Sequence, residues 1–310
     1  MADLIDTGLR TPFRVYWFKW LHPLFRRWGR YLLWARQRRR YFVMAGDYVS
    51  DYTAKFGSFE AEEIALARHA CRVTLGAKRM ARGALVDIGC HIGNYSVELG
   101  GDFGAVLAVD AMASYVHITR ANLAWNRLDA KACVMHCAVS DHEGEAHLAF
   151  QRSGNLGHAH LSTHVQGEAA GVEMIDVEAA TLDTLVGRAG LSEVAYIKID
   201  VEGHEAAVLR GAAQTITSAQ PLIQVEIDQG HLPAVMDLLR EMNVDYQAWQ
   251  VARGDPRQHG FLPRLWTALR SGGNPLFLRQ LDPHTPNPRH LPCVLLLPGA
   301  IDPYRLQVPA

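Results

Sequence analysis

The fold of this chain is decided by ten consecutive residues, Val86-Asp87-Ile88-Gly89-Cys90-His91-Ile92-Gly93-Asn94-Tyr95. An apolar run, Ala84-Leu85-Val86, leads into the carboxylate of Asp87, and a helix-compatible stretch begins at Tyr95. This order predicts a strand, a tight turn and a helix N-terminus, where backbone N–H groups and the helix dipole favour a polar ligand. Gly89 and Gly93 stand where a Cβ would either forbid the turn or hold the ligand away.

The spacing of the two glycines limits which ligand the turn can take. A nicotinamide fingerprint reads G-x-G-x-x-G, whereas this turn reads D-x-G-x-x-x-G. The carboxylate of Asp87, placed before the first glycine, suits a cationic ligand better than a pyrophosphate. S-adenosylmethionine, which carries an ammonium and a sulfonium group, is such a ligand. The alternative that needs no ligand is a buried strand with a tight turn.

A second apolar run, Ala105-Val106-Leu107-Ala108-Val109-Asp110, also ends in an acid. A carboxylate at this distance after the glycine turn can accept hydrogen bonds from both ribose hydroxyls of a nucleoside. Strand, glycine turn, helix and acid-tipped strand together predict one nucleoside-binding half of an α/β fold.

Composition sets the outer bounds of the interpretation. With 310 residues and 49% apolar content, the chain is large enough for one α/β domain with appendages. Its five cysteines form no C-x-x-C pair, which favours a reducing, cytoplasmic compartment and argues against structural zinc. There is no run of 18 apolar residues, so we expect no transmembrane helix, and the first residues do not resemble a signal peptide.

The N-terminal arm has an unusual charge pattern. Between Asp6 and Asp47 there are ten Lys or Arg and no acid, although the net charge of the whole chain is −1. Thr11-Pro12 predicts a helix start, Pro23 a break, and aromatic residues recur at helical spacing between residues 11 and 40. Two interpretations stay open: peripheral contact with the inner face of an anionic membrane, or packing on the catalytic domain or on a second subunit, giving a homodimer. The acidic remainder of the chain argues against nucleic acid.

The rest of the chain alternates strands and helices. We predict helices at 58–76, 114–127, 181–189, 205–219 and 233–242, and strands at 131–139, 145–151, 195–200, 222–227 and 293–297. Residues 145–151 are expected to form a hairpin, and 152–171 and 252–292 to be long loops. The alternation predicts a doubly wound, mostly parallel sheet.

A second group of charged residues follows the strand at 195–200, in the segment Lys198-Ile-Asp200-Val-Glu202-Gly203-His204-Glu205. Asp200 and Glu202 fall at the carboxyl end of that strand, where doubly wound folds bind their ligands. Three functions compete for these groups. They could bind a divalent metal, remove a proton from a substrate hydroxyl, with His204 as a further candidate base, or complement the cationic end of the cofactor. The alternative without a ligand is an acidic helix N-terminus.

These residues belong to a longer pattern that resembles the FkbM family of S-adenosylmethionine-dependent methyltransferases. The pattern covers roughly residues 55–250 and contains Gly57-x-x-Glu60, Asp87-x-Gly-x-x-x-Gly93, Asn122-x-x-x-Asn126, Ala138-Val-Ser-Asp-x-x-Gly144, Gly154-Asn155-x-Gly157, Thr181-Leu-Asp183, Ile197-Lys-Ile-Asp-Val-Glu-Gly-x-Glu205, Val208-Leu-Arg-Gly211 and Gln224-Val-Glu226. The resemblance implies an α/β class I (Rossmann-like) methyltransferase fold over residues 55–310, preceded by a helical arm at 1–54. It also implies O-methylation of a sugar, glycan or other natural-product hydroxyl.

Two departures from the family pattern concern the cofactor side. Cys90-His91 replaces the usual Ala-Asn, and Asp110-Ala111 replaces the usual Glu-Pro. The shorter Asp110 can still hold a ribose, whereas His91 puts a bulkier, titratable group beside the cofactor.

Taken together, we expect S-adenosylmethionine to be bound by Glu60, Asp87, Gly89, Cys90, His91, Gly93, Asn94, Asp110, Ala111, Met112 and Asp141. Asp141 follows the third strand and could hydrogen-bond the adenine amino group. Asp200, Glu202 and His204 are the catalytic candidates, and Asn155 is expected to close the site over substrate. A divalent metal is considered but not favoured. The rival functions are a nicotinamide-dependent oxidoreductase, disfavoured by the glycine spacing, and a membrane-tethered nucleoside-binding module without catalysis.

Overall fold

The structure is a computed structural model that describes residues 4–12, 39–151, 160–162, 172–227, 231–253, 273–283 and 291–307. The α-helices are α3 (Tyr48–Phe56), α4 (Ala61–Thr74), α5 (Gly76–Arg82), α6 (Asn94–Leu99), α7 (Ala113–Trp125), α8 (Leu182–Arg188), α9 (Glu205–Arg210), α10 (Ala213–Ala219) and α11 (Leu232–Glu241). The strands are β1 (Leu4–Pro12), β2 (Ala84–Ile88), β3 (Ala105–Asp110), β4 (Ala132–His136), β5 (Ala138–Ser140), β6 (Gly144–Gln151), β7 (His160–Ser162), β8 (Val172–Thr181), β9 (Val194–Ile199), β10 (Leu222–Ile227), β11 (Tyr246–Arg253), β12 (Gly273–Gln280) and β13 (Leu291–Pro298). Short 3-10 turns are η1 (Gly100–Asp102), η2 (Asp129–Lys131) and η4 (Pro303–Leu306).

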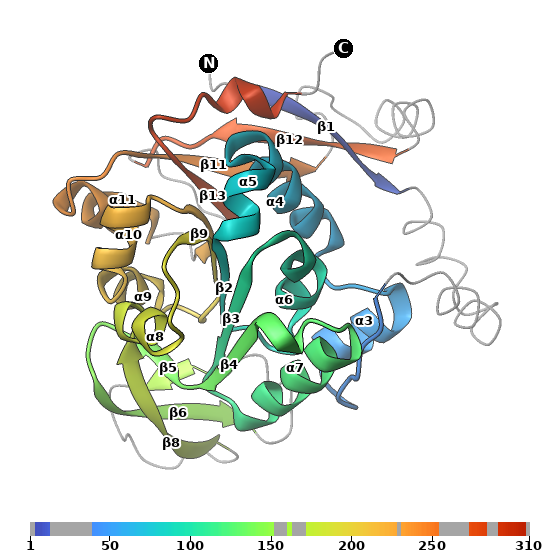
Figure 1. The fold of residues 1–310 in the computed structure, drawn as a ribbon, viewed down its shortest axis with the longest axis vertical. Helices are drawn as coiled ribbons and strands as arrows, with labels where there is room; N and C mark the ends of the chain where they lie inside the picture. Colours follow the sequence, from blue (N-terminus) through green and yellow to red (C-terminus); the bar gives the residue numbers. More distant parts are fainter. Residues whose placement is uncertain are drawn as a thin grey trace.

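The central sheet has nine strands in the order β1-β12-β11-β13-β10-β9-β2-β3-β4 (Figure 1). The run from β10 to β4 is parallel throughout. The chain first builds outward from β2 to β3 and β4, and then returns to add β9 and β10 on the other side of β2. This reversal of strand order is the switch point at which doubly wound sheets bind ligands. The predicted class I, Rossmann-like α/β fold is confirmed.

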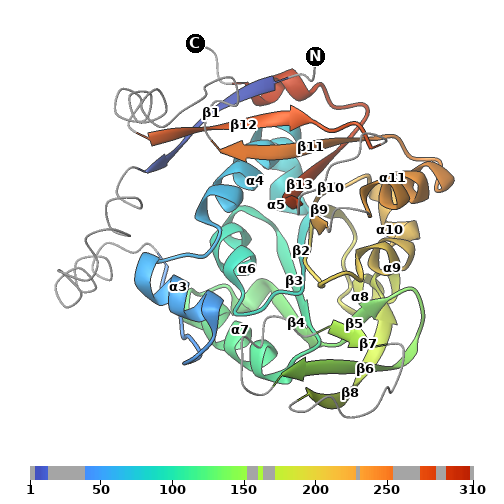
Figure 2. The ribbon, with the colours of Figure 1, turned by 180° about the vertical axis from the view of Figure 1, so that it is seen from behind.

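Side-chain alternation along the parallel strands divides the core between the two faces of the sheet. On β2, Val86 and Ile88 pack with residues of α8 to α11, whereas Leu85 packs with residues of α4, α5 and α6. Because successive side chains of a strand point to opposite faces, a continuous apolar strand needs helices on both. Figures 1 and 2 show these two helical layers on either side of the parallel strands.

Four strands form a second sheet in the order β5-β8-β6-β7. The strand predicted at 131–139 is therefore two strands, since β4 joins the central sheet and β5 joins the small one. The strand predicted at 145–151 is β6, and its expected hairpin is formed with the strand that follows, since β6 pairs antiparallel with β7 as well as with β8. The small sheet packs its Leu148 and Val177 against Ile92 and Tyr115 of the central fold.

The C-terminal part of the chain adds antiparallel strands to the far edge of the sheet. β13, within which the strand at 293–297 was predicted, lies antiparallel between β10 and β11. The prediction of one long loop at 252–292 is wrong in part, because β12 falls inside it and pairs with β11 and β1. The rest of that loop, 254–272 and 284–290, and most of the loop predicted at 152–171 lie outside the described residues.

The first strand, β1, was not predicted. It covers Leu4–Pro12 and pairs antiparallel with β12, so Thr11-Pro12, expected to start a helix, ends a strand instead. Ile5 and Thr7 are buried at this edge. The helical, membrane-binding or packing arm was predicted mainly on residues 13–38, which lie outside the described residues.

Two helix boundaries also differ from the predicted ones. The helix at 58–76 begins only at Ala61, after Glu60, and Gly76 starts the next helix, α5, rather than ending this one. The helix at 205–219 is interrupted at Gly211, where a Cβ would lie 2.0 Å from the main-chain oxygen of Ser140. The glycine therefore marks a close backbone crossing.

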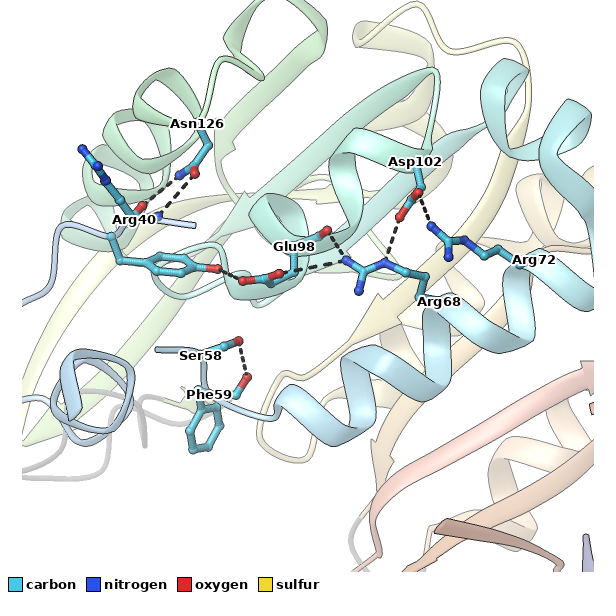
Figure 3. Close-up of polar contacts among 9 residues, drawn as sticks. Arg40, Ser58, Phe59, Arg68, Arg72, Glu98, Asp102 and Asn126 are labelled. Atoms are coloured by element: carbon cyan, nitrogen blue, oxygen red, sulfur yellow. Dashed lines mark hydrogen bonds and ion pairs between the residues drawn. The ribbon is translucent and has the colours of Figure 1, made fainter. Parts of the chain in front are cut away.

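The segment entering the domain at residues 39–45 is held by side chains of α6 and α7. Asn126 exchanges hydrogen bonds with the main chain of Arg40, as Figure 3 shows, and Asn122 does the same with Phe42. The Tyr41 hydroxyl donates to the carboxylate of Glu98. The main-chain oxygen of Glu98 accepts from Arg68, as Figure 3 shows. The Asn122-x-x-x-Asn126 pattern thus fixes the chain that leads into α3.

No helix within the described ranges is long and apolar enough to cross a membrane.

Candidate functional site

A cavity of about 560 Å³ lies at the carboxyl ends of the parallel strands. Its size falls within the range of small-molecule and cofactor pockets. Walls come from α3, the start of α4, the turn after β2, the end of β3, β5 and the ends of β9 and β10. The lining residues include Tyr48, Phe59, Glu60, Asp87, Gly89, Cys90, His91, Asn94, Tyr95, Asp110, Ala111, Met112, Tyr115, Leu148, Lys198, Asp200, Glu202 and Glu226. Most of the predicted cofactor-binding residues are thereby brought together.

The turn after β2 is shaped by two glycines in left-handed backbone conformations. Gly89 has a φ of 72° and Gly93 a φ of 82°. A Cβ on Gly89 would lie 1.7 Å from the main-chain oxygen of Asp200, so this glycine is required by the neighbouring strand end as well as by any ligand. Gly93 is the N-cap residue of α6.

Asp87 organises the helix that follows the turn. It is 2% exposed, and its Oδ2 accepts hydrogen bonds from the Ser96 N–H (3.0 Å) and the Ser96 hydroxyl (2.6 Å). Burial raises the pKa of this carboxyl, and the bonds from Ser96 act against that shift. The carboxylate thus ties β2 to the first turn of α6 while lining the cavity.

Asp110, at the end of β3, holds the glycine turn from the other side. Its two carboxylate oxygens accept the backbone N–H groups of His91 and Met112, both at 2.8 Å. Loss of hydration raises the pKa of Asp110 to about 6, although both hydrogen bonds lower it. A carboxylate held in this way is fixed in position before a ligand arrives.

His91 belongs to a buried cluster that the sequence did not reveal. Its φ is 53°, a conformation that side-chain-bearing residues rarely adopt. The imidazole Nε2 lies 3.1 Å from Asp47 Oδ1, and the ring stacks on Tyr115 with centroids 3.8 Å apart. The Tyr115 hydroxyl donates to the same Asp47 oxygen. Burial acts to raise the pKa of Asp47, but hydrogen bonds from His91 and Ser50 outweigh it and lower the pKa to about 2.

Asp47 also begins α3, since its Oδ2 accepts the Ser50 N–H at 2.8 Å. One carboxylate therefore joins the N-cap of α3 to the cofactor turn. No local sequence signal links positions 47 and 91. The only sequence feature that sets Asp47 apart is its position as the first acidic residue after a stretch of basic ones.

Glu60 stands at the end of a chain of buried polar groups. Its Oε2 accepts the Tyr95 hydroxyl at 3.0 Å, and the Tyr95 oxygen accepts the side-chain amide of Gln224 at 2.6 Å. The Gln224 Oε1 accepts the hydroxyl of Tyr196 at 2.7 Å. Tyr95, Gln224 and Tyr196 are all buried, whereas Glu60 faces the cavity.

Lys198 is a buried cation in an otherwise apolar strand. It is 2% exposed, its Nζ lies 3.2 Å from Asp200 Oδ2 and 5.2 Å from the centre of the Tyr95 ring. Burial lowers its pKa, but the carboxylates of Asp200, Glu60 and Glu226 outweigh burial and leave the pKa raised. A lysine inside a buried strand was the sequence signal that could have identified this residue as part of the site.

Two residues predicted for the site lie elsewhere, in a polar cluster beside the small sheet. His204 Nε2 lies 3.0 Å from the hydroxyl of Ser140, and burial lowers its pKa. Asp141 pairs with His142 and with Arg210, at 2.9 Å each, and these hydrogen bonds lower its pKa to about 2. Neither side chain is among those that line the cavity. Asn155 lies outside the described residues.

Glu202, by contrast, lines the cavity mouth. It is exposed, and its φ is 49°. Among the residues that the structure describes, no group of three or more His, Cys, Asp or Glu is arranged to hold a metal ion.

Comparison with known proteins identifies the family of this chain. The family model "Methyltransferase FkbM domain" matches residues 87–247, slightly more than half of the chain. A search of curated proteins found no match. Similar solved structures include the FkbM methyltransferase of Methylobacillus flagellatus (13% identity, TM-score 0.37), over 64% of this chain and 44% of that one.

Two other similar structures are a precorrin-6y C5,15-methyltransferase from Geobacter metallireducens and an rRNA methylase from Streptococcus thermophilus. The first is 10% identical over 78% of this chain and 93% of that one, with a TM-score of 0.38. The second is 12% identical over 73% of this chain and 100% of that one, with a TM-score of 0.37. Such distant likenesses carry no functional conclusion, and the family match alone identifies the protein. The chain belongs to the FkbM family of methyltransferases.

Proposed function

We propose that this methyltransferase uses S-adenosylmethionine to methylate a hydroxyl oxygen. The observation that carries the proposal is the joint placement of Asp87, Gly89 and Asp110 around one cavity at the switch point of the sheet. The cavity is large enough for a nucleoside with an amino-acid tail, and its acidic lining suits a cationic cofactor.

The residues divide into a cofactor side and an acceptor side. On the cofactor side, Asp110 is placed to take the ribose hydroxyls, and the turn at 89–93 gives the cofactor bare backbone to lie against. S-adenosylmethionine supplies an activated methyl group when bound. The protein then has to align the acceptor oxygen and remove its proton. Asp200 and Glu202, at the end of β9, are the candidate bases.

The acceptor is proposed to be a sugar, glycan or other natural-product hydroxyl. Tyr48 and Phe59 line the cavity with ring centres 6.0 Å apart, and Tyr48 is 58% exposed. Asp200, Glu202 and Glu226 line the same cavity. Aromatic rings together with carboxylates suit a ring that carries several hydroxyl groups.

A thermal-unfolding comparison separates this function from its rivals. S-adenosylmethionine and its demethylated product should both raise the unfolding temperature, since a ligand at 100 times its Kd stabilises a protein by about 2.7 kcal/mol. NAD should have no effect. Stabilisation by NAD alone would favour an oxidoreductase. Tritium from a labelled methyl group should then appear on an oxygen of an acceptor from a hydroxyl panel. Binding without transfer to any acceptor would favour a module without catalysis.

Four features proposed from the sequence accompany this function. They are a cytoplasmic location, peripheral membrane contact through residues 11–40, a homodimer, and the absence of a nucleic-acid partner. Co-sedimentation with anionic vesicles, its release by salt, and the mass in solution would test them.

A further inference from the structure

The cavity holds many more acids than bases. Among the described residues, its lining contains six carboxyl groups, one lysine and one histidine: Glu60, Asp87, Asp110, Asp200, Glu202 and Glu226, with Lys198 and His91. Two of the carboxyls, those of Asp87 and Asp110, accept backbone N–H groups. Lys198 is paired with Asp200. Glu60 therefore shares the charge of Lys198 with another acid.

Glu60 is held in place by its backbone and by its hydrogen bond. It is the N-cap residue of α4 with a φ of 50°, so the main chain is strained at this point. Among the described non-glycine residues with positive φ, three line the cavity, namely Glu60, His91 and Glu202. The bond from Tyr95, backed by Gln224, keeps the carboxyl directed at this site.

Charged and titratable groups approach Glu60 from each element around it. Lys198 on β9 favours its ionised form, and so does the hydroxyl of Tyr95 on α6. Asp200, after β9, and Glu63, on α4, oppose it. Loss of hydration is the largest influence, and the pKa of Glu60 is raised to about 7. At neutral pH, the carboxyl is therefore close to balance between its two forms.

We propose that Glu60 exchanges its proton for the positive charge of the cofactor, so that binding of S-adenosylmethionine is coupled to release of a proton from this residue. The step balances, because the neutral carboxyl becomes a carboxylate paired with the ligand cation, and the proton passes to the buffer. That the cation is S-adenosylmethionine rests on the proposed function. That a cation can bind at Glu60 is inferred from the position of its carboxyl in the cavity.

The coupling makes cofactor affinity depend on pH. If the ionised form binds, the apparent Kd at pH 6 should be about tenfold weaker than the plateau reached above pH 8. About half a proton should leave at pH 7 and almost none at pH 9. Glu60→Gln keeps an acceptor for the Tyr95 hydroxyl but cannot ionise, so the part of the pH dependence of affinity that is centred near pH 7 should be lost.

Titration calorimetry in buffers of different ionisation enthalpy measures the released protons directly. The probes are S-adenosylmethionine and 5′-methylthioadenosine, which has the nucleoside but neither the sulfonium nor the ammonium group. At pH 7, the wild-type protein should release about half a proton more than Glu60→Gln with S-adenosylmethionine, and the two proteins should not differ with 5′-methylthioadenosine. Glu62→Gln is the matched control, because its carboxyl lies on the same helix but does not line the cavity, and it should behave as wild type. Any titration of the cofactor's own amino group is common to all variants.

A second variant tests the same idea without touching Glu60. Tyr95→Phe removes a hydrogen bond that favours the carboxylate, so the pH at which affinity reaches half its plateau should move upward. If thermal unfolding shows that Glu60→Gln does not fold, Tyr95→Phe replaces it as the test of the coupling.

The outcomes separate the two proposals. Tight binding of S-adenosylmethionine without proton release, or equal release by wild type and Glu60→Gln, overturns the coupling alone. No binding of S-adenosylmethionine at any pH overturns the proposed function.

Discussion

The turn after β2 and the turn after β9 follow neighbouring parallel strands, yet they are built differently. In the first, a Cβ on Gly89 would meet main chain, and the flanking carboxylates of Asp87 and Asp110 accept backbone N–H groups. In the second, a Cβ on Gly203 would meet nothing within 4 Å, and Glu202 is exposed. The glycine of the first turn is packed against main chain, whereas the glycine of the second turn faces open space.

The difference between the two turns matches two tasks of the cavity, which are to bind the cofactor and to bind the acceptor. A surface that must fit the same cofactor in every catalytic cycle benefits from groups fixed before binding, because no ordering cost then falls on the ligand. A surface that meets the acceptor can change its side chains without disturbing the fold. We therefore expect the second turn to tolerate substitutions that the first does not.

The two glycines provide the largest expected contrast. Gly203→Ala should cost about 1–2 kcal/mol of unfolding free energy, since only backbone strain opposes it. Gly89→Ala should cost more than about 4 kcal/mol, because the new Cβ adds a collision with the main chain of Asp200. Urea unfolding of both variants measures the difference. Equal losses would show that the two turns are equally constrained.

Glu60, which lines the same cavity, gives a smaller, pH-dependent effect. Its pKa is raised to about 7 from an ordinary value of 4.5, so the folded protein holds a proton that the unfolded chain has lost. Stability from this group is complete below about pH 4.5 and is lost as pH rises to about 7, by at most about 3 kcal/mol. Glu60→Gln should remove this part of the slope in urea unfolding from pH 5 to pH 8. An unchanged slope in the variant would contradict the shift.

A substitution of Asp110 tests whether the first turn binds the cofactor. Asp110→Ala should weaken S-adenosylmethionine binding at least tenfold in titration calorimetry, because hydrogen bonds to a charged acceptor contribute about 1.5–3 kcal/mol each. Asp129→Ala, which removes an exposed carboxylate of η2, is the control and should bind normally. Unchanged affinity in Asp110→Ala would remove the ribose role from this strand end.

The smallest effect is expected from metal removal. The carboxylates of the second turn are proposed to act without a metal, so a chelator should change neither cofactor affinity nor methyl transfer. Loss of methyl transfer in chelator that is restored by Mg²⁺ would instead assign Asp200 and Glu202 to a metal site.

Local patterns predicted the parallel part of the fold because each signal there is contained in a few residues. The apolar runs at β2, β3 and β9 and the glycine turn need no distant partner to be recognised. β12 was missed because Gly273, Asn274 and Pro275 look like a loop, and its partners β11 and β1 cannot be inferred from its own sequence.

The site residues were likewise predictable only where the signal is contained in a few neighbouring residues. Asp87 and Asp110 stand at strand ends and could be found by register, whereas the contacts Asp47–His91 and Glu60–Tyr95 join residues that no spacing rule connects. His204 follows Glu202 closely in sequence but turns to Ser140, since the strained residues 202 and 203 redirect the chain.

The pairing of β1 with β12 has a consequence for how the protein is made. The hydroxyl of Thr7 bonds the main chain of Leu276, 269 residues further along. At a synthesis rate of about 5–20 residues per second, the first strand leaves the ribosome on the order of 10–50 s before its partner. The parallel strands can assemble during this interval, but β1, which is translated before them, must wait with an unpaired backbone edge. β1 is therefore among the last strands to find its place, and it needs protection from aggregation throughout the interval.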